Sequence, residues 1–223
     1  MKRINLSKVK KENERAYQLT INETTFLQQL SHPHIIKYYK SFSSNNCLYI
    51  IMEFMNNGDL SGFIKAHEKF NKPVREEEVW NILLQSMNAL EYIHSKNVIH
   101  RDIKPANLLV DNNMTVKFGH FGASAIKSKE DTLYLNSLYR KFKENEAMKS
   151  HNAFVGSPNY MAKEVLEERD YDQKVDVFSM GITFFELCYF HIPKTIRVKY
   201  GTNRKQIKEF IKNQNPEDAN VHY

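Results

Sequence analysis

The sequence predicts an α+β fold in which a strand-rich part is followed by a mostly helical part. Runs of β-branched and aromatic residues gather near the start of the chain together with one helical pattern, and longer helical patterns follow them. Strands and helices that are segregated rather than strictly alternating are typical of α+β folds. With 223 residues, 41% of them hydrophobic, the chain is long enough for one or two domains with a buried core.

The strand-rich part is predicted to contain a helix within residues 12–33, whose pattern ends at Pro33. Two β-rich runs follow at 35–42 and 47–54, and the sequence Ser-Ser-Asn-Asn between them predicts a hairpin turn. The helix positions that recur at helical spacing are Leu19, Glu23, Phe26, Leu27 and Leu30.

The helix-rich part is predicted to begin with a turn at Asn57-Gly58 and a short helix after it. A long amphipathic helix is expected at 75–96, because acidic residues 76–78 favour its N-terminus and apolar residues line one face. That face consists of Val79, Ile82, Leu83, Met87, Leu90 and Ile93.

Further along, the short segments 98–100, 108–110 and 115–118 predict a small sheet that carries loops. Residues 176–190 are apolar nearly all round, which is typical of a helix buried inside a domain. A last, short amphipathic helix is expected at 202–213.

Composition narrows the function classes. The charged start and the lack of a long apolar run predict no signal peptide and no membrane span, and they favour an intracellular, most simply cytoplasmic, protein. The net charge of +6 comes from scattered basic residues without a nucleic-acid-binding motif, so no nucleic-acid partner is expected. Cys47 and Cys188 lie in apolar surroundings without disulfide or metal-ligand spacing, which predicts reduced core residues.

The most specific motif is His-Arg-Asp-Ile-Lys-Pro-Ala-Asn-Leu-Leu at 100–109. It resembles the catalytic loop of eukaryotic protein kinases at every informative position, and Lys104 favours the serine/threonine branch. Residues 32–42, 55–64 and 185–193 are similar to the NIMA-related (Nek-like) kinases. The resemblance covers nearly the whole chain and implies a two-lobed kinase fold, ATP and Mg²⁺ as cofactors, and a protein as substrate or partner.

The resemblance assigns the residues of phosphoryl transfer, which needs an aligned hydroxyl and charge placed around the phosphate. Asp102 would act as catalytic base, Lys104 would neutralise the γ-phosphate, and Asn107 would hold one Mg²⁺ through its amide oxygen. His100 and Arg101 would have structural roles in packing the loop.

The segment 156–166 resembles the loop that receives the protein substrate in these kinases. Ser157 would bridge Asp102 and Lys104, while Lys163 replaces the proline that normally precedes the glutamate at 164. Asp176 would brace the backbone of the catalytic loop.

The resemblance also assigns an ATP site. Glu23 corresponds to the helix glutamate that pairs with a strand lysine, and Lys2 is the candidate for that lysine. Because the interval between them exceeds the family pattern, a small insertion within 7–13 is implied. In the hinge-like segment, Met52 would be the gatekeeper residue beside adenine, and Glu53 and Met55 would offer backbone groups to the edge of adenine. Further along the chain, Asp59 would reach the ribose and Leu109 would form the floor of the pocket.

His120 is the main departure from the family pattern, because it stands where the metal-binding aspartate of Asp-Phe-Gly is expected. Mg²⁺ prefers anionic oxygen ligands, so His120 occupies the second ligand position without being expected to serve as a ligand. The resemblance further implies a domain truncated at both ends, without the glycine-rich loop and the last helices. A fragment and a degenerate kinase domain are both compatible with that pattern.

The activation segment, 120–164, is enlarged. Leu135, Leu138, Tyr139 and Phe142 share one helical face, which predicts an inserted helix that packs either on the domain or on a partner. Possible phosphorylation sites in this segment are Ser128, Thr132, Ser137 and Ser150.

These assignments divide the chain into a partial small lobe at 1–54 and a partial large lobe at 55–223, with the buried helix at 176–190. Two functions remain open. The first is a Nek-like serine/threonine kinase with weak or absent activity, and the second is a pseudokinase that acts as an interaction or regulatory module.

Overall fold

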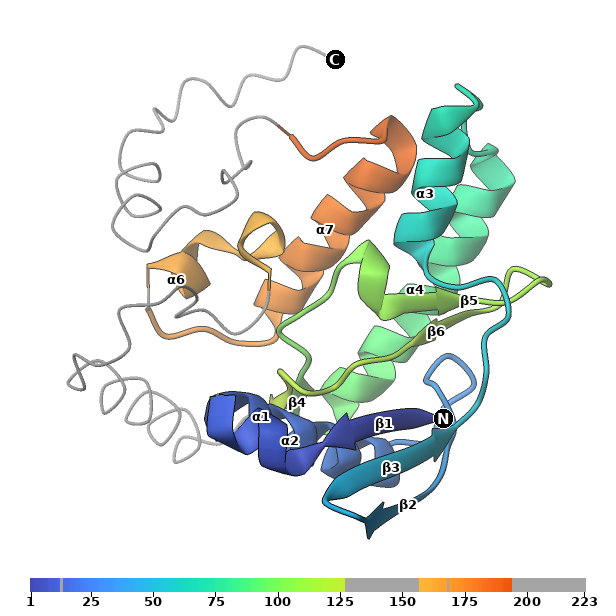
Figure 1. Cartoon of the computed structure of the whole chain (residues 1–223). Coiled ribbons are helices and arrows are strands. Elements are labelled where there is room, and N and C mark those ends of the chain that lie inside the picture. Colours follow the sequence, from blue (N-terminus) through green and yellow to red (C-terminus); the bar gives the residue numbers. More distant parts are fainter. Residues whose placement is uncertain (13, 127–156, 168, 194–223) are drawn as a thin grey trace.

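The structure is a computed structural model of the whole chain, and it describes residues 1–12, 14–126, 157–167 and 169–193. A three-stranded sheet with two helices beside it forms one end of the described part, and longer helices form the other end (Figure 1). The mixed α+β class predicted from the sequence is therefore confirmed. The predicted helices at 135–142 and 202–213 and the four possible phosphorylation sites lie outside the described residues.

The sheet is antiparallel with strand order β1-β3-β2, formed by β1 (Lys2–Asn5), β2 (Tyr38–Ser44) and β3 (Cys47–Met52). The predicted hairpin is β2-β3, and its turn residues Asn45 and Asn46 have φ of 49° and 58°. Asparagine tolerates this left-handed conformation, which matches the twist of the flanking strands.

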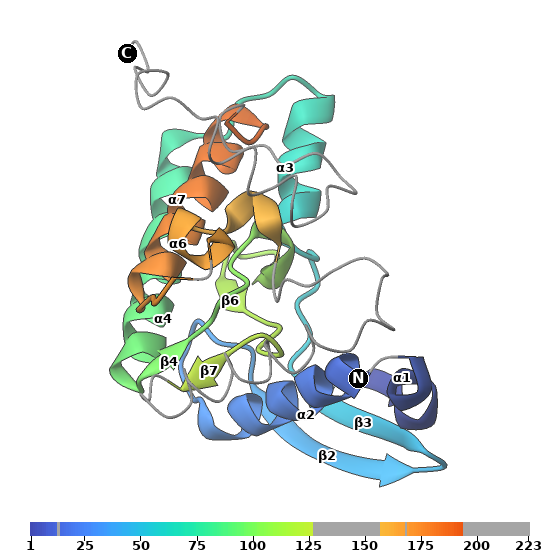
Figure 2. The same cartoon turned by 90° about the vertical axis from the view of Figure 1, so that its left-hand side faces the viewer.

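Two helices follow β1 in the chain. Helix α1 (Leu6–Glu12) occupies the segment in which an insertion was implied, and α2 (Glu14–Gln29) is the helix predicted before Pro33. Figure 2 shows α2 lying along the sheet. Its residues Phe26 and Leu27 are buried, and so is the Glu23 carboxylate side chain.

Helix α3 (Leu60–Lys69) begins after the predicted turn, where Gly58 has φ of 75° and the Asp59 side chain accepts a hydrogen bond from the backbone N–H of Gly62. Helix α4 (Glu76–Ser95) is the long amphipathic helix, and Ile82, Leu90 and Ile93 of its predicted face are buried. The prediction for Met87 was wrong, because Met87 is 38% exposed. The buried face turns instead toward the small side chains of Ser86 and Ala89.

Two separate two-stranded antiparallel sheets replace the single small sheet that the sequence predicted. Strand β5 (Leu108–Val110) pairs with β6 (Val116–Phe118), whereas β4 (Val98–Ile99) pairs with β7 (Ala125–Ile126). The β4-β7 pair joins the two ends of the segment that carries the catalytic-loop motif and His120. A short 3-10 helix, η1 (Pro105–Asn107), leads into β5.

The last described helices are η2 (Pro158–Tyr160), α6 (Lys163–Leu166) and α7 (Lys174–Tyr189). Helix α7 is the apolar helix predicted at 176–190, but only one side of it is buried, since Val177 is 48% exposed. The prediction that Cys188 is a core residue was also wrong, because Cys188 is exposed, while Cys47 is buried as expected. Apolar composition alone does not distinguish a helix buried all round from one buried on one side.

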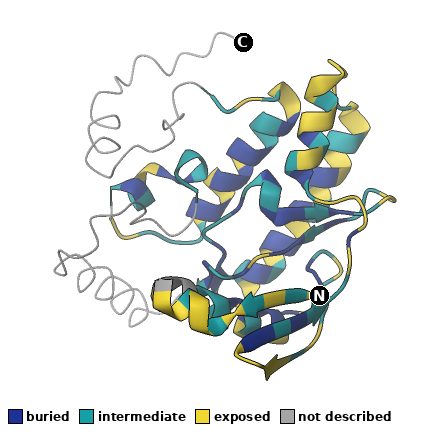
Figure 3. Ribbon diagram, viewed as in Figure 1, coloured by how far each residue is buried: buried dark blue, intermediate teal, exposed yellow. Residues whose placement is uncertain are grey.

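One cluster of buried apolar side chains runs through α2, α3, α4, β5, β6 and α7, and Figure 3 shows buried residues along α4, β5, β6 and α7. Phe118 and Phe121 are fully buried within it. The helical part and the strand-rich part therefore share a continuous core among the described residues. No helix in the described ranges is long and apolar enough to cross a lipid bilayer.

Candidate active site

Asp176, in the first turn of α7, holds the start of the catalytic-loop motif by hydrogen bonds to its backbone. Its fully buried carboxylate accepts hydrogen bonds of 2.8 Å from the backbone N–H groups of both His100 and Arg101, and its Oδ2 lies 2.9 Å from Nε2 of His94. A buried carboxylate needs such donors, and two adjacent N–H groups aimed at it set the direction of the chain. Arg101 accordingly has φ of 64°.

Two ring contacts and one arginine hold the loop against the segment around His120. The His100 ring is fully buried and packs edge-on against Phe118 and Phe121, with ring centroids 5.4 and 5.0 Å away. Nε of Arg101 donates a hydrogen bond of 2.6 Å to the carbonyl oxygen of Ala123. These contacts agree with the structural roles expected for His100 and Arg101.

Asp102, Lys104, Asn107 and Ser157 meet in one hydrogen-bonded group. Nζ of Lys104 lies 3.2 and 3.0 Å from the two carboxylate oxygens of Asp102 and donates to Oγ of Ser157 at 2.7 Å. Nδ2 of Asn107 donates to Oδ2 of Asp102 at 2.7 Å and to its carbonyl oxygen at 2.6 Å. The Lys104 ammonium therefore links Asp102 to Ser157, whereas the sequence had suggested that Ser157 would bridge Asp102 and Lys104.

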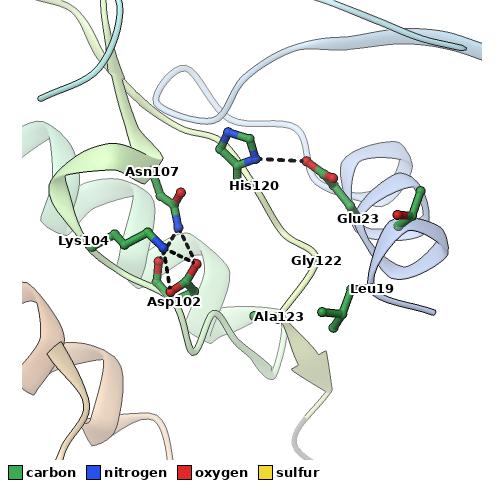
Figure 4. Close-up of a pocket in the computed structure, with 9 residues that line it drawn as sticks. Leu19, Glu23, Asp102, Lys104, Asn107, His120, Gly122 and Ala123 are labelled. Carbon is green, nitrogen blue, oxygen red and sulfur yellow. Dashed lines mark hydrogen bonds and ion pairs between the residues drawn. The ribbon is translucent and has the colours of Figure 1, made fainter. Parts of the chain in front are cut away.

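Glu23 faces this group from α2, and Figure 4 shows its contact with His120; its other partner is Lys2. Its Oε2 lies 2.6 Å from Nζ of Lys2, and its Oε1 lies 3.4 Å from Nδ1 of His120. Burial by itself would raise the pKa of the Glu23 carboxyl, but the hydrogen bond from His120 and the charge of Lys2 outweigh burial and hold that pKa below its ordinary value.

The backbone around His120 is held close to α2. His120 has φ of 59°, which is uncommon for a residue other than glycine. A Cβ atom on Gly122 would lie 3.0 Å from the carbonyl oxygen of Leu19, so only glycine fits there without a shift of α2. The packing role expected for Phe121 is present, because its side chain is fully buried.

These residues line one cavity of about 330 Å³ between α2 and the catalytic loop. Figure 4 shows Glu23 and His120 on one side of it and Asp102, Lys104 and Asn107 on the other. The residues that line it are Leu19, Thr20, Glu23, Asp102, Lys104, Asn107, His120, Gly122 and Ala123.

The donor set of this cavity does not fit Mg²⁺. Both carboxylates in it already face an ammonium, and the position opposite Asn107 carries a nitrogen donor instead of a carboxylate. Within the described ranges, no group of three or more His, Cys, Asp or Glu side chains is placed to hold a metal ion. Mg²⁺ requires near-octahedral oxygen ligands, and its expected site at Asn107, which offers a neutral amide oxygen, lacks the anionic oxygen that an aspartate at position 120 would supply.

The remaining ATP-site candidates lie away from the cavity lining. Met52 ends β3 and packs against the core, and the Met55 side chain is buried. Asp59 uses Oδ1 to cap α3 and forms a β-bridge with Leu109. The backbone N–H of Glu53 donates to the carbonyl oxygen of Lys37 at 2.8 Å.

Two contacts in this region were not expected from the sequence. Nζ of Lys117 lies 2.8 Å from Oε1 and 2.9 Å from Oε2 of Glu53, and this ion pair connects the hinge-like segment to β6. Tyr160 donates to Glu186 of α7 at 2.5 Å, and burial together with this carboxylate raises the pKa of the Tyr160 hydroxyl. Neither pair has a sequence signal, because its members are separated by 64 and 26 residues.

The family model of the protein kinase domain matches residues 1–222. The chain is 36% identical over 185 residues to the probable serine/threonine-protein kinase nek2 of Dictyostelium discoideum, which covers 81% of this chain and 40% of that protein. It is 33% identical over 185 residues to the human serine/threonine-protein kinase Nek2, with 80% and 38% covered.

A third relative is the serine/threonine-protein kinase Tao of Drosophila melanogaster, which is 36% identical over 181 residues, with 80% of this chain and 15% of that protein covered. The chain thus spans less than half the length of each of these three relatives.

Proposed function

Because the chain belongs to the protein kinase family, we propose that it is a Nek-like serine/threonine kinase domain that binds ATP and transfers its γ-phosphoryl group to protein weakly or not at all. The observation that carries this proposal is the group formed by Asp102, Lys104 and Asn107, which faces the Lys2–Glu23 ion pair across one cavity. That arrangement supplies the base and the charges that phosphoryl transfer requires.

The finer fold assignment belongs to the same proposal. Residues 1–54 would form a partial small lobe and residues 55–223 a partial large lobe, with the cavity between α2 and the catalytic loop at their junction. Adenine would then lie toward Met52, Glu53 and Met55, and the phosphates toward Lys2 and Lys104.

Each residue of the group has a defined task in this mechanism. The Asp102 carboxylate orients the attacking serine or threonine hydroxyl and takes up its proton. Lys104 stands 3.0 Å from Asp102 and contacts the oxygens of the phosphoryl group as it moves. Asn107 holds the Asp102 side chain in position through its 2.7 Å hydrogen bond.

His120 explains why the proposed activity is weak. At a site with an aspartate in place of His120, a bound Mg²⁺ would supply positive charge against the negative charge that develops on the phosphoryl group. The donor set around Asn107 and His120 does not fit this ion, so that contribution is lost. The loss of one group that stabilises developing charge costs about 3–4 kcal/mol, which is on the order of a hundred- to thousandfold in rate.

A phosphorylation assay on the purified chain tests this proposal. We expect a low rate of phosphate transfer from ATP to a generic protein substrate, its loss in Asp102→Asn, and a gain of about tenfold or more in His120→Asp with Mg²⁺ present. Fast Mg²⁺-dependent transfer by the unaltered chain, abolished by Asp102→Asn, would contradict the weak-activity proposal. Failure of the folded chain to bind ATP would contradict the nucleotide site altogether.

The second candidate function is a pseudokinase that acts as an interaction or regulatory module. The contact of His120 with Glu23 favours it, because this contact joins α2 to the segment after β6 through protein side chains alone. The same assay separates the two candidates. A pseudokinase shows no phosphate transfer above the Asp102→Asn background, even after His120→Asp.

A further inference from the structure

The charges of the cavity are already balanced by side chains. It contains two carboxylates, Glu23 and Asp102, and each has an ammonium at close range. Nζ of Lys2 lies 2.6 Å from Glu23, and Nζ of Lys104 lies 3.0 Å from Asp102. Among the described residues that line the cavity there is no third carboxylate.

His120, unlike an aspartate at the same position, adds no negative charge to these two ion pairs. An aspartate at this position would give the cavity an excess negative charge, which would repel the phosphates of a nucleotide unless a cation bound between them. Imidazole adds no negative charge. Its Nδ1 contacts Glu23 at 3.4 Å, and its side chain, which lines the cavity, remains 48% exposed. A polyanion can therefore approach these groups without a bridging cation.

Both carboxylates are also occupied as potential metal ligands. A divalent cation at Asp102 would have to displace Lys104 and break the hydrogen bond from Asn107. A cation at Glu23 would have to displace Lys2 and His120. Each displacement sacrifices a charge-assisted hydrogen bond, so a metal ion gains little by entering.

We propose that this cavity binds the polyphosphate of a nucleoside triphosphate without a divalent cation, with Lys2, Lys104 and His120 supplying the groups that contact the phosphates. The inference rests on the proposed ATP site. It adds that the nucleotide binds there without a divalent cation. His120 is then a binding residue at the position where the family pattern has a metal-binding aspartate.

Isothermal titration of the full chain with ATP tests this inference, once in Mg²⁺ and once in EDTA. We expect the two dissociation constants of the unaltered chain to agree within about threefold. The variant His120→Asp adds the third carboxylate, and we expect its affinity for ATP to fall by about tenfold or more in EDTA relative to Mg²⁺.

Two further variants make the test specific. His120→Asn removes the ring without adding charge, so its ATP affinity is expected to stay independent of Mg²⁺, and it also serves if His120→Asp fails to fold. His191→Asp places a new carboxylate on an exposed residue outside the cavity lining and is expected to behave as the unaltered chain does.

The possible results are distinct. ATP binding by the unaltered chain that is at least tenfold tighter with Mg²⁺ than with EDTA would overturn the inference and leave the proposed ATP site standing. A gain of Mg²⁺ dependence in His191→Asp equal to that in His120→Asp would also overturn it. If the folded chain, checked by circular dichroism, binds ATP under neither condition, the proposed ATP site falls as well.

Discussion

At position 120 an imidazole faces the carboxylate of Glu23, whose second oxygen is held by Lys2. The sequence indicated that His120 would remove a metal ligand, and it suggested Glu23 and Lys2 as a pair. It did not indicate that His120 and Lys2 would contact the same carboxylate, that of Glu23. One substitution therefore has two effects at this site: it removes an anionic oxygen, and it gives a helix carboxylate a second hydrogen-bonding partner.

Glu23→Gln tests the energetic role of this carboxylate. We expect a loss of about 1–3 kcal/mol in the free energy of unfolding at pH 7, because a mostly buried group loses its ion pair with Lys2 and its contact with His120. The folded pKa of Glu23 is lowered, so its contribution is present above its unfolded pKa and is lost as the pH falls through the folded value.

Urea unfolding of both chains between pH 7 and pH 3 measures this effect, and the difference between them should narrow toward acid pH. Glu14→Gln is a matched control, since Glu14 is exposed on the same helix and its replacement should change the stability by less than about 0.5 kcal/mol. A pH-independent difference would show that Glu23 acts only through packing.

His100 has a separate pH signature. Complete burial lowers the pKa of its ring from the ordinary value of 6.5, although the carboxylates of Asp176 and Asp102 oppose that shift. The unfolded chain then binds a proton below about pH 6.5 that the folded chain does not bind, so stability falls as the pH drops. The limiting slope for one proton is about 1.4 kcal/mol per pH unit.

His100→Phe keeps an aromatic ring against Phe118 and Phe121 but does not titrate. We expect this variant to be less stable at pH 7, where it lacks the 3.3 Å hydrogen bond from the backbone N–H of Asp102, and to show a shallower loss of stability between pH 7 and pH 5. Denaturant titrations over that pH range measure the slope. Equal slopes in the two proteins would refute the assignment to His100.

At the scale of single elements, local sequence signals predicted most of what the structure contains. Helices α2 and α4 and the β2-β3 hairpin follow from periodicity and from turn residues, because those signals act within one element. The errors concern sidedness: Met87 on α4 and Cys188 on α7 are exposed. Which side of an apolar helix is covered depends on its neighbours rather than on its own composition.

Helix α3 offers a prediction at this scale through Asp59, which caps its first turn. Asp59→Ala should lower the free energy of unfolding by about 1 kcal/mol, because the backbone N–H of Gly62 loses its acceptor. Asp59→Asn keeps a capping oxygen and should cost a few tenths of a kcal/mol at most. Thermal unfolding of the two variants distinguishes them, and equal losses would mean that the charge matters rather than the cap.

At the scale of the whole molecule, Asp176 connects three elements that are distant in the chain. Its carboxylate lies in α7, contacts His94 of α4 and accepts both backbone N–H groups at the start of the catalytic loop. The geometry of the candidate site therefore depends on the packing of the helices beneath it.

Asp176→Ala should lower the free energy of unfolding by about 2–4 kcal/mol, because it leaves the N–H groups of His100 and Arg101 without their acceptor. ATP binding should weaken in the same variant, as the loop loses its support. Asp170→Ala is the matched control, since Asp170 is exposed, and we expect a change below about 0.5 kcal/mol. Urea unfolding and calorimetry measure both quantities, and a stable Asp176→Ala variant would exclude the anchoring role.

The sequence by itself determined the family resemblance, the α+β class and the candidate residues of the catalytic loop, because these depend on motifs and periodicities within short segments. Only the tertiary structure decided which distant residues meet. His120 joins Lys2, the partner that the resemblance assigned, at the carboxylate of Glu23, Lys117 reaches Glu53, and β4 pairs with β7. The side-chain contacts join positions that are 21 to 97 residues apart along the chain. Side-chain packing across the shared core selects such contacts, and no local sequence pattern encodes that packing.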